Sequence, residues 1–384
     1  MKALSASSNS ADPYRAGLEL GTALKACSPE VVLLFATIHF AEEEELIEGI
    51  YDALDNDNLI LIGNTGDGYY ESKGPGDVGV AALGLNSEGK VRWLIHHSTG
   101  ITANPMAVTE QLLSLVQSDL GARCAQFSYF ISDFHADASQ IEKVLERHRA
   151  WPIVGGFAAD DNQMSSCRLY CNREVLADAA IMLSAVGEVA FSISIGNSIT
   201  PVGQPGMIES SSGTTIHQID GICATRFVER ETGKPVLQSD SGVTSLSILD
   251  VDDSQIKRLR SIVPQLSRTD RDVGLYGGIE TGKMVQVCVA EPEEIIREVY
   301  QIAAREKERG REAVAAIIVS CAGRKWLLGD KIHHEIDAVV GQFGRELPLV
   351  GFPSFGEIGP LRTKEGYSRN LFHNMTYVLL LLFH

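Results

Sequence analysis

The feature that most constrains this chain is a short pattern that it repeats three times. In residues 59–68, 152–161 and 348–360, an aliphatic run leads to a glycine, and an acidic side chain follows a few positions later. Such a run is typical of a buried strand, and the glycine permits backbone angles or close contacts that other residues do not. The repeat therefore predicts three strands that each lead into a loop, and we expect these loops to form the functional site.

Each copy belongs to a longer repeated unit. An apolar strand and an amphipathic helix precede the glycine loop, at residues 31–38 and 41–56, then 126–132 and 138–148, then 314–320 and 330–343. Hairpins are expected after the first two loops, pairing residues 79–85 with 91–96 and residues 167–171 with 179–183. This order predicts an α/β fold with two domains and mixed β-sheets flanked by helices, containing repeated strand-helix-strand-hairpin units.

The length of 384 residues exceeds what one hydrophobic core usually serves, so two domains are expected. The stretch 201–206, rich in proline and glycine, is the best internal boundary. We therefore divide the chain into an N-terminal extension at 1–29 and two domains at 30–207 and 208–384. The extension is expected to be a loosely docked start followed by a helix near residues 14–26.

Charge and composition exclude several classes of function. The net charge of −17, with scattered basic residues, argues against binding to nucleic acid or to an anionic membrane. No apolar run is long enough to span a membrane, and the N-terminus does not resemble a signal peptide. Seven cysteines are too few for a disulfide scaffold in a chain of this length. These features favour a reduced, cytoplasmic protein.

A set of short motifs resembles the FIST family, with FIST-N at 30–207 followed by FIST-C at 208–384. The resemblance covers nearly the whole chain, from about residue 31 to residue 378, and each motif occurs in the expected order. The motifs are Ile62-Gly-Asn-Thr-Gly-Asp-Gly68, Pro152-Ile-Val-Gly-Gly-Phe-Ala-Ala-Asp160, Pro201-Val-Gly203, Ile219–Ala224, Ser320-Cys-Ala-Gly-Arg324, Gly351–Gly359 and His373-Asn-Met-Thr376.

The resemblance implies a cytoplasmic sensor of a small ligand. Stand-alone FIST proteins of similar organisation bind haem and sense nitric oxide, and amino acids are suggested ligands elsewhere in the family. Because the chain contains no kinase, cyclase or F-box segment, the resemblance implies that it regulates a separate protein, either a histidine kinase or a cyclic-di-GMP enzyme. Haem-based nitric oxide sensing is the leading interpretation, and an amino acid or another small metabolite is the alternative ligand. A third hypothesis is an enzyme that uses Cys321 or Glu357, although no recognisable catalytic constellation is present.

The residues of the motifs supply candidates for ligand binding. Arg324 has a guanidinium group that suits an anionic ligand, but a structural ion pair with Glu357 or Asp160 is an equal alternative. Cys321 lacks a visible base, so a buried thiol is the simpler interpretation. The full set of candidates is Asn64, Thr65, Asp67, Gly155, Gly156, Asp160, Cys321, Arg324, Glu357 and Asn374.

Three acidic residues occupy similar places in the glycine loops. Asp67 and Asp160 are expected to make turn hydrogen bonds, as Asp does routinely in such loops. Glu357 is a poorer turn former, which favours contact with a ligand. Asn374 and Thr376 are expected to satisfy buried backbone groups near the loops.

Haem would require an axial ligand, and the sequence lacks a Cys-x-x-Cys-His attachment motif, so any haem b would be noncovalent. No spacing singles out one histidine, and each alone is more typical of a surface or capping residue. Cys167 and Cys171 face the same side of a predicted strand, but zinc usually needs a second pair of ligands, so we reject a site there. The candidate axial ligands are His39, His96, His97, His135 and His373.

Overall fold

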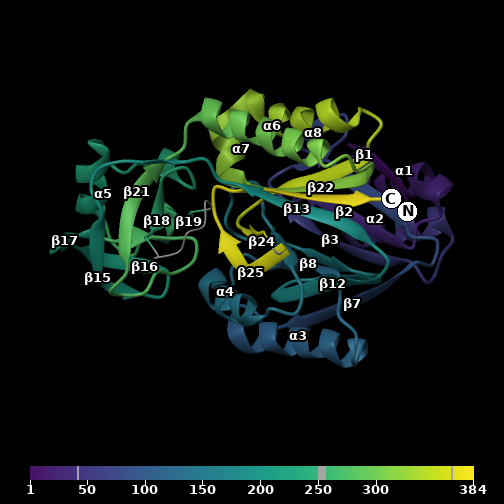
Figure 1. Cartoon of the computed structure of the whole chain (residues 1–384), viewed down its shortest axis with the longest axis horizontal. Coiled ribbons are helices and arrows are strands. Elements are labelled where there is room, and N and C mark those ends of the chain that lie inside the picture. Colours follow the sequence, from purple (N-terminus) through teal and green to yellow (C-terminus); the bar gives the residue numbers. More distant parts are fainter. Residues whose placement is uncertain (41–42, 250–256, 365) are drawn as a thin grey trace.

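The computed structural model describes residues 1–40, 43–249, 257–364 and 366–384. It confirms the α/β class, with several mixed sheets flanked by helices. Three six-stranded sheets form the main body of the molecule. The remaining described strands form one eight-stranded sheet in a smaller lobe at the left of Figure 1.

The first sheet is built on the parallel strands β2 (Val31–Thr37) and β3 (Ile60–Gly66). Helix α2 (Glu43–Leu54) connects them; residues 41–42 of the predicted helix lie outside the described residues. Every residue of β2 is buried, which explains its continuous apolar run. Strands β6 (Val80–Asn86) and β1 (Lys2–Ser8) extend the sheet beyond β2.

The second and third sheets repeat this plan. In the second, β8 (Phe127–Ser132), α4 (Ala138–Arg147) and β9 (Ile153–Phe157) form the central unit, with β12 (Ala179–Gly187) and β7 (Val91–Thr99) on one side. In the third, the corresponding elements are β22 (Ala313–Cys321), α7 (Ala322–Leu328), α8 (His334–Phe343), β23 (Leu349–Ser354), β26 (Tyr377–Phe383) and β13 (Ala190–Gly196).

The hairpin that follows each glycine strand completes a different sheet from its own. Hairpin β4–β5 (Tyr69–Glu71, Gly74–Gly76) adds to β23, β24–β25 (Glu357–Thr363, Gly366–His373) adds to β9, and β10–β11 (Leu169–Cys171, Glu174–Leu176) adds to β3. Each sheet thus receives the hairpin of another unit in a cyclic order, and the strand pairing has the same register in all three units. Gly351 lies opposite Tyr70, Gly155 opposite Ile358, and Gly63 opposite Tyr170.

The two predicted hairpins are wrong. Residues 79–85 and 91–96 form β6 and β7, which belong to different sheets. Residues 167–171 contribute β10, which pairs with β11 and β3, whereas residues 179–187 form β12 in another sheet. The physical reason is that each strand is buried against its own sheet, and the connecting segment turns the chain from one sheet to the next.

Glycine is required in the repeated strands because a neighbouring backbone passes very close. A Cβ atom added at Gly63, Gly155 or Gly351 would lie about 2 Å or less from a carbonyl oxygen of the adjacent parallel strand. Those oxygens belong to Leu34, Phe130 and Ile318, which are paired with the three glycines. The repeated glycine therefore serves the packing of the sheets.

Helix pairs cover the outer faces of the sheets, and the inner faces share a core. Helices α1 (Pro13–Leu24) and α2 cover the first sheet, α3 (Pro105–Leu120) and α4 the second, and α6 (Pro292–Glu308) and α8 the third (Figure 1). Inside, Phe35 of the first sheet stacks on Phe352 of the third with ring centroids 4.9 Å apart.

The N-terminal residues are more integrated than the sequence suggested. The expected loosely docked start is wrong, because β1 pairs with β6 over seven residues and α1 packs against α2. Strand β13 also pairs with β26, so the two regions divided near residue 207 share a sheet. The boundary itself stays a sequence-based prediction. Within the described residues, no helix is both long and apolar enough to cross a membrane.

The lobe contains the remaining described strands and one α-helix, α5 (Ala224–Thr232). Its sheet includes β15 (Gly206–Ser212), β16 (Thr215–Ile219), β18 (Ser245–Ile248), β19 (Arg258–Ser261) and β21 (Met284–Val289), with the short strands β14 (Thr200–Pro201), β17 (Ile222–Cys223) and β20 (Val273–Gly274) at its margins. A separate hydrophobic cluster fills it. Residues 250–256 are outside the described part of the chain.

The glycine contact gives a direct stability prediction. We expect Gly63→Ala to lower the free energy of unfolding by about 2–4 kcal/mol, because the new methyl group collides with backbone that has no room to move. The matched control is Gly341→Ala in α8, where no atom lies within 4 Å of the added Cβ, and helix propensity predicts a gain of up to about 1 kcal/mol. Urea unfolding of both variants measures the difference; equal effects would contradict the packing argument.

Candidate functional site

The three glycine loops meet at one end of the sheets, joined by a cyclic set of backbone hydrogen bonds. In each loop, the carbonyl two residues after the repeated glycine accepts from an N–H of another loop, and that N–H lies four residues after its own glycine. The bonds run from Asp67 N to Pro353 O (3.0 Å), from Ala159 N to Thr65 O (2.8 Å) and from Phe355 N to Phe157 O (3.4 Å). The structure thus brings together loops that the sequence could only show to be similar.

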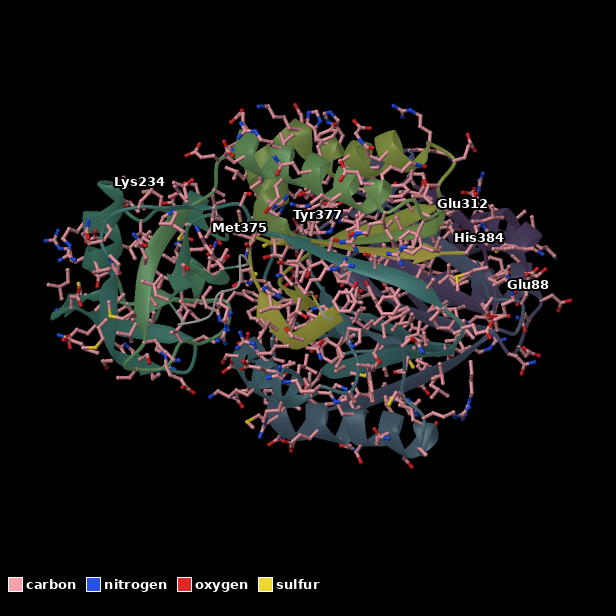
Figure 2. All side chains as sticks on the ribbon, viewed as in Figure 1. Glu88, Lys234, Glu312, Met375, Tyr377 and His384 are labelled. Carbon is pink, nitrogen blue, oxygen red and sulfur yellow. The ribbon has the colours of Figure 1, made fainter. Side chains whose placement is uncertain are left out.

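A pocket lies where these loops and α7 face the lobe; we call it the interlobe pocket. Its cavity volume is only about 20 Å³, which is room for about one water molecule. Met375, labelled in Figure 2, lies near this boundary. The lining residues are Met164, Ser241, Gly242, Ser261, Val263, Tyr276, Cys321, Ala322, Gly323, Trp326, Ser354, Phe355 and Asn374.

Cys321 lines the pocket at the junction between β22 and α7. Burial raises the pKa of its thiol, and the nearby carboxyl group of Glu357 raises it further. The side chain is therefore a protonated thiol at neutral pH. A cysteine nucleophile needs the opposite shift, toward the thiolate.

Glu357 begins β24 and is fully buried beside Cys321. Its Oε2 accepts from the backbone N–H of Thr376 at 3.3 Å, and its Oε1 has no hydrogen-bond partner among the described residues. Burial raises the pKa of this carboxyl group well above its ordinary value. Burial thus favours the protonated form of the side chain, which can donate a hydrogen bond as well as accept one.

Arg324 in α7 is also fully buried. It forms an ion pair through Nε. Its Nε donates to Glu335 Oε1 at 2.7 Å, and Tyr70 donates to the other carboxylate oxygen at 3.1 Å. The predicted partners, Glu357 and Asp160, are therefore wrong for this pair: the acid comes from α8. The Nη1 and Nη2 atoms have no hydrogen-bond partner among the described residues, and the guanidinium group lies over the ring of Tyr377, 5.7 Å from its centroid. Unpaired donors are costly in a buried site, so these atoms are suited to a further acceptor.

The two loop aspartates have different roles. Asp160 Oδ1 accepts from Met164 N at 2.9 Å, and Oδ2 accepts from Ser165 N at 2.6 Å and Ser166 N at 3.0 Å, which confirms a turn-forming role. Asp67 instead connects its loop to α7. Its Oδ2 accepts from Trp326 Nε1 at 2.7 Å. Burial raises the pKa of Asp67 to about 6.

Other candidates from the sequence hold the loops or border the pocket. Asn64 donates to Thr65 O at 2.9 Å, and Thr65 Oγ1 accepts from Arg168 N at 3.1 Å. Gly155 and Gly156 lie in the close-packed strand β9. Asn374 Oδ1 accepts from Ser261 N of the lobe at 2.9 Å, so it both satisfies buried backbone and lines the pocket.

Of the ten sequence candidates, Cys321 and Asn374 line the pocket, while Arg324 and Glu357 lie near Cys321 behind it. Sequence reasoning missed the walls of the pocket. Tyr276 and Gly242 come from the lobe, and Trp326 and Phe355 from α7 and the third glycine loop. Phe355 lies within the Gly351–Gly359 motif and Trp326 lies two residues after the Ser320–Arg324 motif, which is a usable signal; no pattern marked the residues of the lobe.

The candidate axial histidines do not gather around the interlobe pocket, and none of its lining residues is a histidine. His373 is fully buried, its Nε2 lies 3.1 Å from Gly359 O, and burial lowers its pKa to about 4. The others lie beside polar partners: His39 with Asp161 (3.4 Å), His96 with Asp119 (3.0 Å), His97 with Cys171 (3.6 Å) and His135 with Asp133 (2.7 Å). Because its cavity volume is only about 20 Å³ and no histidine lines it, the pocket does not fit haem.

Comparison with known protein families gives two matches. The family model of the FIST N domain matches residues 2–111 and 30–222, which together span more than half of the chain, and that of the FIST C domain matches residues 244–360. The first FIST N match covers the first repeated unit, and the second match covers both the first and the second units. No curated protein matches the chain.

The raised pKa of Asp67 predicts a pH dependence of stability. Between pH 4 and pH 7 the unfolded chain ionises this carboxyl group before the folded chain does, so the folded state binds more protons and its stability falls as the pH rises. We expect the stability difference between the wild type and Asp67→Asn to shift against the wild type by about 2–3 kcal/mol over this range. Urea unfolding of both proteins at pH 4 and pH 7 measures the shift; a constant difference would refute it.

Proposed function

Because this chain belongs to the FIST family, whose domains sense small ligands in signalling proteins, we propose that it is a sensor whose ligand binds in the interlobe pocket. The proposed ligand is a small metabolite with an anionic group, of about the size of an amino acid. As described, the pocket has a volume of only about 20 Å³, so a ligand of this size requires the lobe to move away from α7 and the glycine loops.

The observation that carries the proposal is the buried polar group behind Cys321. Arg324 keeps two unpaired nitrogen atoms and Glu357 keeps one unpaired oxygen, although both side chains are fully buried. A fixed cation in such surroundings favours an anionic ligand group, and a neutral acid beside it suits a ligand that can donate or accept. Cys321 lines the pocket and is a neighbour of both Arg324 and Glu357. We therefore expect the anionic group of the ligand to bind at the Cys321 end of the pocket.

The position of the pocket suggests how binding becomes a signal. One wall is formed by the lobe and the other by α7 and the glycine loops. A ligand that binds between the two walls favours an arrangement in which they lie further apart, and a separate protein can bind that arrangement selectively. A histidine kinase or a cyclic-di-GMP enzyme is the proposed partner, and the cytoplasm is the proposed compartment, since all seven cysteines have free thiols.

Two other interpretations have weaker support from the geometry. An enzyme that uses Cys321 is disfavoured because burial holds the thiol in its unreactive, protonated form. Haem-based nitric oxide sensing stays a prediction from the family resemblance. Of the candidate histidines, His97 borders an open depression, which it shares with Tyr51 and Arg173; that surface mixes polar and apolar groups about equally, whereas noncovalent haem prefers an apolar site.

The ligand proposal is tested by blocking the pocket. The probes are the standard amino acids and small dicarboxylic acids, screened by thermal shift and then by calorimetry. We expect at least one to stabilise the wild type, by about 2.7 kcal/mol at 100 times its Kd. Val263→Phe should weaken binding at least about tenfold, because the added ring enters the pocket, whereas Val78→Phe, on an exposed valine, should leave binding unchanged. Binding that persists in Val263→Phe would place the ligand elsewhere.

Haem binding requires its own measurement. The protein is titrated with haemin and then exposed to nitric oxide. If the interlobe pocket is the ligand site, we expect the absorption spectrum to remain that of free haem. A saturable one-to-one Soret shift that responds to nitric oxide would reverse this conclusion. In that case, His97→Ala and His373→Ala would distinguish the open surface site from a site that requires the core to rearrange.

A further inference from the structure

Three side chains with metal-binding atoms lie together just beyond β8. Asp133 and His135 follow the strand directly, and Cys167 comes from the long loop between β9 and β10. Their ligand atoms all lie within 4.8 Å of one another. From the sequence, we rejected a zinc site at Cys167 because Cys171 was the sole second ligand and no other pair was present. In the folded chain, Asp133 and His135 lie near Cys167 and provide the missing ligands. From this juxtaposition we propose that Asp133, His135 and Cys167 bind one zinc ion.

The spacing suits the proposed ion. Zinc bound at about 2.0–2.3 Å in a tetrahedral site separates its ligand atoms by about 3.3–3.8 Å. Asp133 Oδ1 and His135 Nδ1 are 2.7 Å apart, and the widest separation in the group is no more than 4.8 Å. Small side-chain rotations bring these distances to the required values. A mixture of sulfur, nitrogen and oxygen ligands is also characteristic of zinc, while calcium and magnesium require oxygen.

Neighbouring contacts hold two of the ligands in position. Asp133 Oδ1 accepts from the backbone N–H of His135 at 2.9 Å, and its Oδ2 accepts from Asp178 N at 2.9 Å. The ring of Phe134 stacks on His135 with centroids 4.1 Å apart, and Phe134 O accepts from Tyr276 at 3.1 Å. Such supporting contacts orient metal ligands and are a usual part of metal sites.

The exposure of the three side chains matches a site that is reached from solvent. Cys167 and Asp133 are buried, whereas the side chain of His135 is 39% exposed and leaves a route for the ion and for a water molecule as fourth ligand. Burial raises the pKa of the Cys167 thiol, so the metal-free site holds a protonated thiol. Binding converts the thiol and Zn²⁺ to a zinc-bound thiolate and releases one proton, and affinity therefore rises with pH.

An ordinary turn explains the contact between Asp133 and His135, and the buried thiol of Cys167 faces the same carboxyl group. The first repeated unit provides the comparison. Since Leu34 and Phe130 both pair with the repeated glycines, Thr37 corresponds to Asp133 and His39 to His135. There His39 lies near Asp161 at 3.4 Å, and the threonine offers no carboxylate. The ligand set is therefore a property of the second unit, and His39 is its matched control.

The test uses the full chain, stripped of metal and titrated with Co²⁺, whose bond to a thiolate gives a charge-transfer band in the near ultraviolet. We expect one Co²⁺ per chain, displacement by Zn²⁺, and the loss of the band in Cys167→Ser. His135→Ala should weaken binding by at least about 10-fold, because losing a direct ligand costs no less than losing one of its supporting contacts, while the fold is retained, since this side chain is partly exposed. Cys171→Ser and His39→Ala should bind as the wild type does.

Three results would overturn the zinc site: no thiolate band in the wild type, a band that persists in Cys167→Ser, or an equal loss in the Cys171→Ser control. Near-ultraviolet circular dichroism of each variant separates loss of metal from loss of fold, and His135→Ala decides the question if Cys167→Ser fails to fold. The site shares no side chain with the interlobe pocket, so this outcome is independent of the ligand proposal.

Discussion

The whole structure depends on one close approach of two backbones. In each unit, a glycine brings its strand against the carbonyl oxygen of the preceding parallel strand, where a side chain would collide. The same glycine faces the hairpin of another unit, so each sheet is completed by a segment that lies far away in the sequence. This cyclic exchange joins the three sheets into one body, and it draws the three loops together through reciprocal backbone hydrogen bonds.

The parts of the fold that local patterns specify were predictable. The continuous apolar run of β2 and the apolar face of α2 identified the strand and helix of the first unit, and the same holds for β8 with α4. Strand pairing was not predictable from such patterns. Strands β6 and β7 are joined by a tight turn, yet each pairs in a different sheet, because long-range burial outweighs the local turn.

The candidate site shows the same division between local and long-range information. Glu357 stood out because glutamate is a poor turn former, and the structure places it in the buried group behind the pocket. The acid that pairs with Arg324 was predicted in the loops but comes from Glu335 in α8, which no motif marked. Tyr276 and Gly242 reach the pocket only through the packing of the lobe. Cys167 likewise meets His135 only after folding.

Where the three units differ, their chemistry differs as well. Three residues after the position opposite the repeated glycine, at the end of the first strand or directly after it, the three units carry Thr37, Asp133 and Cys321. Thr37 bonds to the backbone of Gly79, which is a structural role. Asp133 fixes His135 beside a thiol, and Cys321 faces the interlobe pocket. The scaffold thus presents one position three times at the converging ends of its sheets, and a single side chain there decides whether a unit supports the fold, supplies a metal ligand or borders a ligand pocket.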